Sequence, residues 1–342
     1  MLDKLVKNSI VQYEETNTLF ENSIIESFNG TRLSTNKTFI RESANLLKEN
    51  NDSGFLKFLF ESADMLDALL DICLLTFSTE NTKLGADIVT FSLPAGWSCP
   101  FANACLKKVD RYRDIDQSKI GTHRISKKTG GEIPYKGSVV TKKGDSSEFD
   151  CYAANMEMQY ELVRENRWHN YDLLKAAGGY MEQAKLIIKS LEYYYSEYGH
   201  KNTVRIHESG DFYTGEYLLA WIEVAKAMPN VNFYAYTKSI PFVKKYKSEL
   251  DKLGNFSLTL SEGGKRDRDI GGLDVKSAKV FNTPEAVLKA GLLIDLDDSL
   301  AQERGGQNNN FALLIHGTQK PGEISLDRRR NETFMAYWKY RK

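Results

Sequence analysis

From about residue 85 onward, short runs rich in β-branched and aromatic residues alternate with longer runs of helical periodicity. This alternation is typical of a parallel sheet whose strands are connected by helices. About six such steps are present, fewer than the eight of a closed β/α barrel. The pattern therefore predicts an α/β fold, either a partial barrel or an open wound sheet. The expected strands are 88–93, 204–207, 232–237, 256–261, 279–281 and 311–316.

The first part of the chain has a different pattern. Within residues 1–84, segments such as 38–48 and 55–71 repeat apolar residues at helical spacing. We therefore expect a helical N-terminal extension over 1–84 and a β/α domain over 85–342. The polar segment 107–148 predicts an insertion in that domain, either an excursion or a hairpin. Cys73 lies in an apolar run, which favours a small buried hydrophobe.

Charge and apolar content narrow the range of partners. The 342 residues contain 46 Lys and Arg against 46 Asp and Glu, so the formal net charge is zero. Nucleic acid is a possible partner, but a neutral chain does not indicate it. No apolar stretch reaches the roughly 18–20 residues that span a bilayer, so we expect no membrane association. The start of the chain lacks a secretory signal, and four cysteines are too few for a disulfide scaffold, which together predict the cytoplasm.

Polar and small residues follow every predicted strand. In a parallel sheet the carboxyl ends of the strands lie on one edge, where β/α proteins bind their ligands. The sequence therefore predicts a binding site built from several strand ends. The segments expected there are 94–99, 207–212, 236–239, 261–266 and 316–318.

Three cysteines fall in or beside these segments. Cys99 and Cys105 occupy the loop after the first strand, and Cys151 begins a predicted helix. The N-terminus of a helix favours the thiolate form of cysteine. Three thiolates are suited to a [4Fe–4S] cluster with one open iron. They are also suited to zinc completed by a histidine or water, and the remaining interpretation is three unrelated free thiols.

The second strand ends in an unusual set of polar residues. Gly210 permits close approach of the backbone to a ligand, and the acids beside it would accept hydrogen bonds from an amine or a ribose. His207 belongs to the same segment. The alternative is a simple strand-to-helix turn in which Asp211 or Thr214 is the N-cap. Lys238, after the third strand, either offers an ammonium group to an anion or is a solvated rim residue.

These motifs, taken in order, resemble a known family. Ser92–Gly96 with Cys99 and Cys105, then Cys151-Tyr-Ala, then 205–212 and 233–238, are similar to the phage-associated gene product 88 family. More distantly, the layout resembles radical SAM enzymes. In those enzymes, three cysteines after the first strand of a six-step partial barrel hold a [4Fe–4S] cluster whose open iron binds S-adenosylmethionine.

This second resemblance implies a radical-SAM-like partial (β/α)6 barrel and specific roles for residues. Cys99, Cys105 and Cys151 would be the cluster ligands. Ser209-Gly210-Asp211 occupies the place of the Gly-Gly-Glu-type motif that binds the methionyl amine. The chain departs from the usual Cys-x3-Cys-x2-Cys spacing, because the insertion separates Cys105 from Cys151.

Two functional hypotheses follow. The first is an iron–sulfur protein that cleaves S-adenosylmethionine and starts radical chemistry on a substrate, in the host cytoplasm if the protein is phage-encoded. The second is a phage protein, stabilised by a metal and associated with nucleic acid or replication, without redox catalysis. In that case the basic loops 127–143 and 265–268, with Trp97 and Trp168, would contact a nucleic-acid strand.

Overall fold

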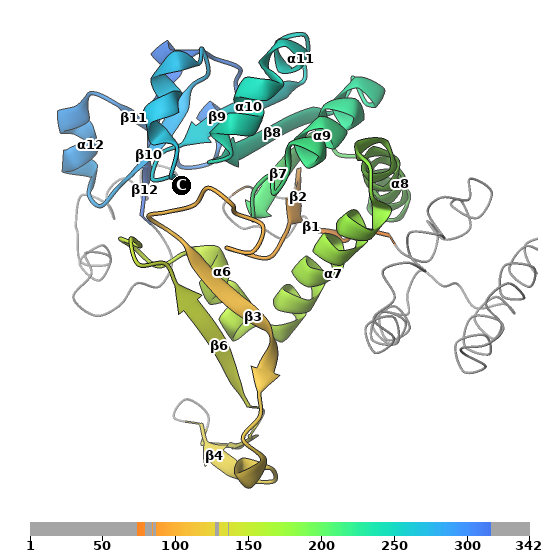
Figure 1. Ribbon diagram of the computed structural model, residues 1–342, viewed down its shortest axis with the longest axis vertical. Coiled ribbons are helices and arrows are strands. Elements are labelled where there is room, and N and C mark those ends of the chain that lie inside the picture. The colour runs from red at the N-terminus through yellow and green to blue at the C-terminus, as the bar shows by residue number, and fades with distance from the viewer. Residues whose placement is uncertain (1–73, 79–83, 85–86, 127–129, 136, 316–342) are drawn as a thin grey trace, which may run out of the picture.

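The computed structural model describes residues 74–78, 84, 87–126, 130–135 and 137–315. The helices predicted within 1–73, Cys73 and the segment 316–318 therefore lie outside the described residues. The main sheet has the order β1-β2-β7-β8-β9-β10-β12-β11 (Figure 1). Its strands are β1 (Phe77–Ser78), β2 (Ile88–Ser92), β7 (Thr203–Ser209), β8 (Asn232–Thr237), β9 (Phe256–Ser261), β10 (Ser277–Phe281), β11 (Leu293–Ile294) and β12 (Phe311–Leu314).

The sheet is mostly parallel. Only β1 runs antiparallel to its neighbour, with Phe77 opposite Phe91, so the sheet begins before the expected boundary at residue 84. All other neighbouring strands pair in parallel, which confirms the predicted α/β class. From β2 through β7, β8, β9 and β10, neighbouring strands follow chain order. Strands β1 and β11 are the two edges, so this sheet is open.

The connecting helices begin where the sequence predicts them. Thr214 caps α9 by accepting a hydrogen bond from the Tyr217 backbone, and Thr283 caps α12 in the same way, with Pro284 in the first turn. The helical pattern of 152–176 and of 240–253 predicts one helix in each segment, but the first is divided at Tyr160 and the second at Tyr246. The helices are α6 (Tyr152–Gln159), α7 (Glu161–Ala177), α8 (Tyr180–Tyr198), α9 (Gly215–Ala227), α10 (Ile240–Lys245), α11 (Lys247–Asp251), α12 (Pro284–Ala290) and α13 (Ser299–Gln302).

The two faces of the sheet differ in chemistry. Alternate residues of β7 and β8, such as Ile206 and Phe233, pack with Trp221 of α9 in the main hydrophobic core. The residues between them, Arg205 and Tyr234, face the other way. That second face, called the polar face below, combines polar side chains with a smaller apolar cluster, and it is partly covered by α13, whose Ala301 carbonyl accepts a hydrogen bond from Ser257. The polar face leads to the site described below.

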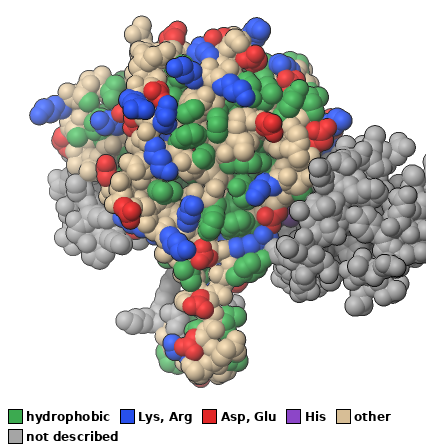
Figure 2. Space-filling view, in the orientation of Figure 1, with side chains coloured by type: hydrophobic (Ala, Val, Ile, Leu, Met, Phe, Trp, Pro, Cys, Tyr) green, Lys and Arg blue, Asp and Glu red, His purple; other side chains and the backbone are tan. Residues whose placement is uncertain are grey.

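The polar segment predicted as an insertion forms two antiparallel pairs. Strand β3 (Lys107–Asp114) pairs with β6 (Ser138–Lys143), and β4 (His123–Ile125) pairs with β5 (Glu132–Pro134). Figure 1 shows them as an arm that extends away from the main sheet. On the face shown in Figure 2, basic and acidic side chains are interspersed. Across the described residues, no helix is long and apolar enough to cross a bilayer.

Candidate functional site

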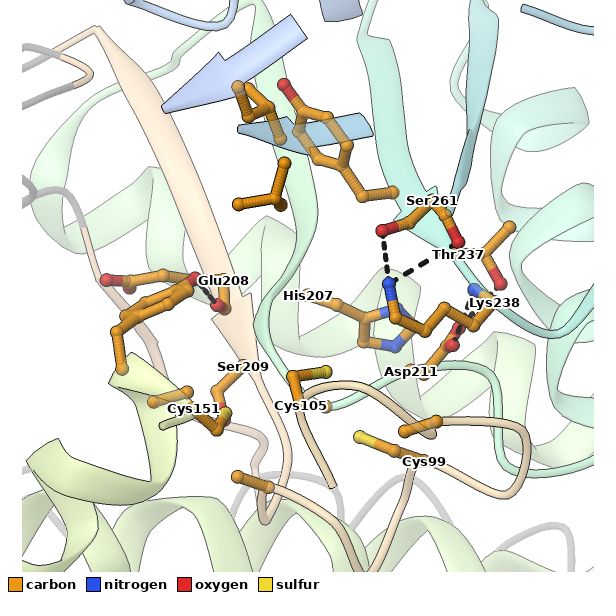
Figure 3. Close-up of a pocket in the computed structure, with 18 of the residues that line it drawn as sticks. Cys99, Cys105, Cys151, His207, Glu208, Ser209, Asp211, Thr237, Lys238 and Ser261 are labelled. Atoms are coloured by element: carbon orange, nitrogen blue, oxygen red, sulfur yellow. Dashed lines mark hydrogen bonds between the residues drawn. The ribbon is translucent and has the colours of Figure 1, made fainter. Parts of the chain in front are cut away.

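A cavity of about 190 Å³ lies at the carboxyl ends of the parallel strands. Its walls come from the loop after β2, the start of α6, and the ends of β7, β8 and β9, as the sequence predicts for a β/α fold. All eight residues proposed for the site line this one cavity (Figure 3). They are Cys99, Cys105, Cys151, His207, Ser209, Gly210, Asp211 and Lys238.

The loop after β2 carries the first two cysteines. It opens with a tight turn in which the backbone N–H and the hydroxyl of Ser98 both donate to the Pro94 carbonyl, at 3.1 and 2.7 Å. The Gly96 N–H then points at the Cys99 sulfur, 3.4 Å away. Further along, the Ala104 N–H donates to the Gly263 carbonyl at 2.9 Å, so the loop after β9 holds Cys105 in place.

The arm explains how Cys105 meets Cys151 across a long separation in sequence. Lys107 at the start of β3 is directly opposite Lys143 at the end of β6, so the insertion leaves and returns at one point. The ammonium groups of both lysines lie 3.6 Å from the Asp150 carboxylate, immediately before Cys151. The unusual spacing in sequence is therefore compatible with a compact group of three cysteines.

The three thiols form one electrostatic group. Figure 3 shows Cys105 between Cys99 and Cys151. Burial, then Asp211, then the other two thiols raise the pKa of Cys99. Burial and Cys105 raise the pKa of Cys151 to about 12, although backbone N–H groups of Ala153 and Ala154 favour its thiolate. Without a cation the Cys99 and Cys151 thiols are therefore protonated at neutral pH.

The three cysteines of the cavity limit which metal ion or cluster this site could hold. In the described part of the chain, no three or more His, Cys, Asp or Glu residues are arranged to hold a single metal ion. The cysteine ligands of an iron–sulfur cluster bind different iron atoms, so their sulfurs stand further apart than the ligands of one ion. Three half-buried thiols around a cavity, with no fourth cysteine among the described residues, fit a three-cysteine cluster.

A buried ion pair between Glu157 and Arg167 lies beside the site, and no motif in the sequence indicates it. Glu157 of α6 accepts hydrogen bonds from the Ala95 N–H at 2.9 Å and from Arg167 of α7 at 2.8 Å. The Ser209 hydroxyl is 3.5 Å from the same carboxylate oxygen. Glu157 therefore connects the cysteine loop, the helix that Cys151 begins, and the end of β7. Nothing in the local sequence of α6 indicates that Glu157 faces inward.

The end of β7 contains an irregularity. Thr90 of β2 pairs with Arg205 and Ser92 pairs with Ser209, so two residues of β2 match four of β7. Such a bulge redirects side chains and is common beside active sites. Within it His207 adopts φ +68°, a left-handed conformation that is uncommon outside glycine. The bulge, which sequence patterns do not reveal, turns this segment toward the cavity.

His207 itself faces hydrophobic surroundings. Its ring packs on Phe212, its Nε2 lies 3.1 Å from the Tyr217 hydroxyl, and its Nδ1 has no partner among the described residues. Burial, with the nearby Arg205 cation, lowers the pKa of His207 to about 3. The ring is therefore neutral at physiological pH.

This shift predicts a pH dependence of stability. Between pH 7 and pH 5 the unfolded chain takes up a proton at His207, with its ordinary pKa of about 6.5, whereas the folded protein does not. His207 therefore lowers the free energy of unfolding by about 2 kcal/mol over that interval. Urea denaturation of wild type and His207→Asn at both pH values measures this, since asparagine tolerates the left-handed backbone. An unchanged difference between the two proteins at pH 7 and pH 5 would contradict the assignment.

Gly210 packs directly against the cysteine loop. It has φ +92°, and a Cβ there would lie 2.6 Å from the Ser98 Oγ and 2.7 Å from the Leu93 Cβ. Gly178 also has positive φ, +82°, but open space around it. We expect Gly178→Ala to cost about 1–2 kcal/mol from the backbone alone, and Gly210→Ala about 1–3 kcal/mol more from overpacking. Urea denaturation of both variants measures the difference, and equal costs would refute the close packing.

Asp211 and Lys238 connect neighbouring strand ends. One Asp211 oxygen accepts from the Phe212 N–H and the Thr237 hydroxyl, and the other accepts from the Lys238 N–H at 2.8 Å. A carboxylate has about four acceptor positions, so one remains for a ligand. Burial raises the pKa of Asp211 to about 6 against these hydrogen bonds. The Lys238 ammonium is occupied by Ser261 and by the Glu262 carbonyl, at 2.5 and 2.8 Å.

The basic loop after β9 is internally paired. The Asp267 carboxylate accepts hydrogen bonds from the N–H groups of Gly263 and Gly264, at 2.7 and 2.8 Å. Arg266 pairs with Asp269 at 2.8 Å, and Lys265 donates to the Pro100 carbonyl. Arg268 differs, because its side chain is largely exposed and lies 3.9 Å from the Asp269 carboxylate. The other loop considered for nucleic acid includes 127–129 and 136, which lie outside the described residues.

Fold and site together define an α/β protein with a mostly parallel sheet and a strand-end cavity lined by three cysteines. A family model described as gene product 88 matches residues 73–335, and the chain belongs to that family. It is 30% identical over 114 residues to the Gene 88 protein of Mycobacterium phage D29, covering 32% of this chain and 46% of that protein. It is 30% identical over 91 residues to the Gene 88 protein of Mycobacterium phage L5, covering 26% and 38%.

These matches confirm the resemblance to phage gene product 88 proteins. The chain matches less than half the length of either curated relative. No solved structure matches the chain.

Proposed function

We propose that this protein is an iron–sulfur protein of radical-SAM-like architecture, with a [4Fe–4S] cluster on Cys99, Cys105 and Cys151. The observation that carries the proposal is the convergence of these three cysteines, from two distant segments, on one cavity at the strand ends. A sheet whose strands neighbour one another largely in chain order supports the partial-barrel part of it.

The surroundings of the thiols also support a cluster. Burial and repulsion from neighbouring thiols keep Cys99 and Cys151 protonated in the absence of a cation. A cluster would supply positive charge that makes the thiolate the favoured form. The helix N-terminus at Cys151 and the Gly96 N–H would donate hydrogen bonds to the ligand sulfurs.

Cys99, Cys105 and Cys151 would hold the cluster in the cavity that Ser209, Gly210 and Asp211 also line. When bound, the cluster would supply one electron to S-adenosylmethionine, whose carbon–sulfur bond breaks to give methionine and a carbon radical that abstracts a hydrogen atom from the substrate. The chain's own part is to orient the ligand: Ser209-Gly210-Asp211 would receive the methionyl amine, using the acceptor position left on Asp211.

The experiment is anaerobic purification and reconstitution of the full chain. We expect about four iron and four sulfide per chain with the visible absorption of a cluster. With a reductant and S-adenosylmethionine we expect methionine and 5′-deoxyadenosine. Absence of iron after reconstitution would refute the proposal. Iron without cleavage would leave an iron–sulfur protein and remove the radical chemistry.

A further inference from the structure

A buried guanidinium lies inside the same cavity, on the polar face of the sheet. Arg205 of β7 lines the cavity and is only 8% exposed. Its Nη1 lies 2.7 Å from the Asp298 carboxylate, and its guanidinium carbon is 5.3 Å from the centre of the Tyr236 ring. Tyr234 also hydrogen-bonds to Asp298, at 3.2 Å. Arg205 is therefore held in place by an ion pair on one side and an aromatic ring on another.

The guanidinium is only partly satisfied by these contacts. Its Nε is buried and has no hydrogen-bond partner among the described residues. The ion pair of the guanidinium with Asp298 involves Nη1 instead. A guanidinium carries five N–H donors in a planar fork. With Nη1 on Asp298, Nε still lacks an acceptor. An unpaired buried donor costs free energy, so such a donor on a side chain that lines a cavity points to a ligand.

The charge of Arg205 is secure. Burial lowers its pKa, but the Asp298 carboxylate together with Tyr152, Tyr234 and Tyr236 outweighs burial, and the net shift is upward. Arginine has no acceptor, so the ligand group must offer oxygens. Two parallel N–H bonds match the two oxygens of a carboxylate or a phosphate better than they match a single carbonyl.

The rest of the cavity suggests how such a ligand would lie. Tyr152, next to Cys151, donates its hydroxyl to the Glu208 carbonyl and is close enough to Arg205 for the cation to lower its pKa against the larger effect of burial. Arg205 and the three cysteines therefore line one continuous cavity. Apolar side chains from β10 and β12, including Val280 and Leu313, line the same space.

We propose that the Nε–Nη2 edge of Arg205 binds an oxyanion of the substrate, a carboxylate or a phosphate, while its apolar part packs against Val280 and Leu313. The oxyanion site rests on the geometry above. Its assignment as a substrate subsite rests on the proposed function. Tyr236 and Asp298 then act as positioning residues, because they orient the guanidinium rather than the ligand.

The test is equilibrium binding by calorimetry on the full chain, with inorganic phosphate, hexanoate and hexanamide as probes. We expect saturable binding of phosphate or hexanoate, and the one that binds identifies the kind of oxyanion. Arg205→Lys keeps a cation for Asp298 but loses the two-donor edge, so binding should weaken at least about tenfold. Arg111→Lys is the matched control, since Arg111 pairs with Asp172 outside the cavity, and should bind as wild type does.

Equal affinity in wild type and Arg205→Lys, or no binding of either anion, would overturn the proposal. If Arg205→Lys does not fold, hexanoate and hexanamide decide on the unchanged protein, because equal binding of acid and amide would exclude an oxyanion site. Iron is measured in the same preparations. If Cys105→Ala loses iron and still binds the anion, both proposals are supported. If the wild type contains no iron and still binds the anion, the cluster proposal is wrong and the oxyanion site stands.

Discussion

Alanine in place of Cys99, Cys105 or Cys151 is expected to lower the iron affinity of the anaerobically reconstituted protein more than about 100-fold. Loss of a partner that only supports a ligand already costs roughly 10–100-fold, and each of these variants removes a ligand itself. Iron and sulfide analysis with visible spectroscopy measures the effect. Because the three thiols line one cavity, we expect similar losses in all three variants.

Cys73→Ala is the matched control for this series. The sequence predicts that Cys73 is a small buried hydrophobe, so this variant should retain its iron. Iron retained in all three cavity variants would remove the cluster from this site. Loss in one variant alone would indicate that the cysteines do not share one group.

Glu157→Ala is expected to lower the free energy of unfolding by about 3–5 kcal/mol, since it leaves the Arg167 cation buried without its partner. The same change removes the acceptor for the Ala95 N–H, at the start of the cysteine loop. Urea denaturation of the protein without added metal measures this effect separately from any cluster. We also expect weaker iron retention, because Glu157 connects the segments that carry the cysteines.

Two comparisons isolate the buried pair. Glu223→Ala removes a carboxylate from a surface pair with Lys226, and should change stability by less than about 1 kcal/mol. Glu157→Gln keeps an acceptor for the Ala95 N–H and loses the charge, so its cost should fall between the two. A Glu157→Ala variant as stable as Glu223→Ala would contradict the structural role of the pair.

Much of the fold follows from local patterns. The strands β2, β7, β8 and β9 are apolar runs or clear alternations, and Thr214 and Thr283 begin helices as their residue types predict. Strands β1 and β11 have only two residues each, too few to show a period. The division between α6 and α7 at Tyr160 has no proline or glycine beside it, so nothing in the local sequence marked it.

The sequence also predicts part of the candidate site and leaves the contacts within it undetermined. The strand-end rule located His207, Gly210, Asp211 and Lys238 because parallel strands present their carboxyl ends together. It did not reveal that Lys238 donates to the end of β9, nor that Asp211 already accepts three hydrogen bonds. Those contacts depend on distances between loops, which periodicity does not encode. The radical-SAM-like roles of these residues stay predictions.

The sequence by itself determined the α/β class, the edge of the sheet that carries the polar residues, and which cysteines could act together. These properties depend on local periodicity and on the geometry common to parallel sheets. Only the tertiary structure decided that the arm returns to its starting point and brings Cys105 to Cys151. It also decided that Glu157 meets Arg167 and that Arg205 meets Asp298 inside the protein. A buried charge must find its partner across the fold, and that pairing depends on packing between segments far apart in the chain.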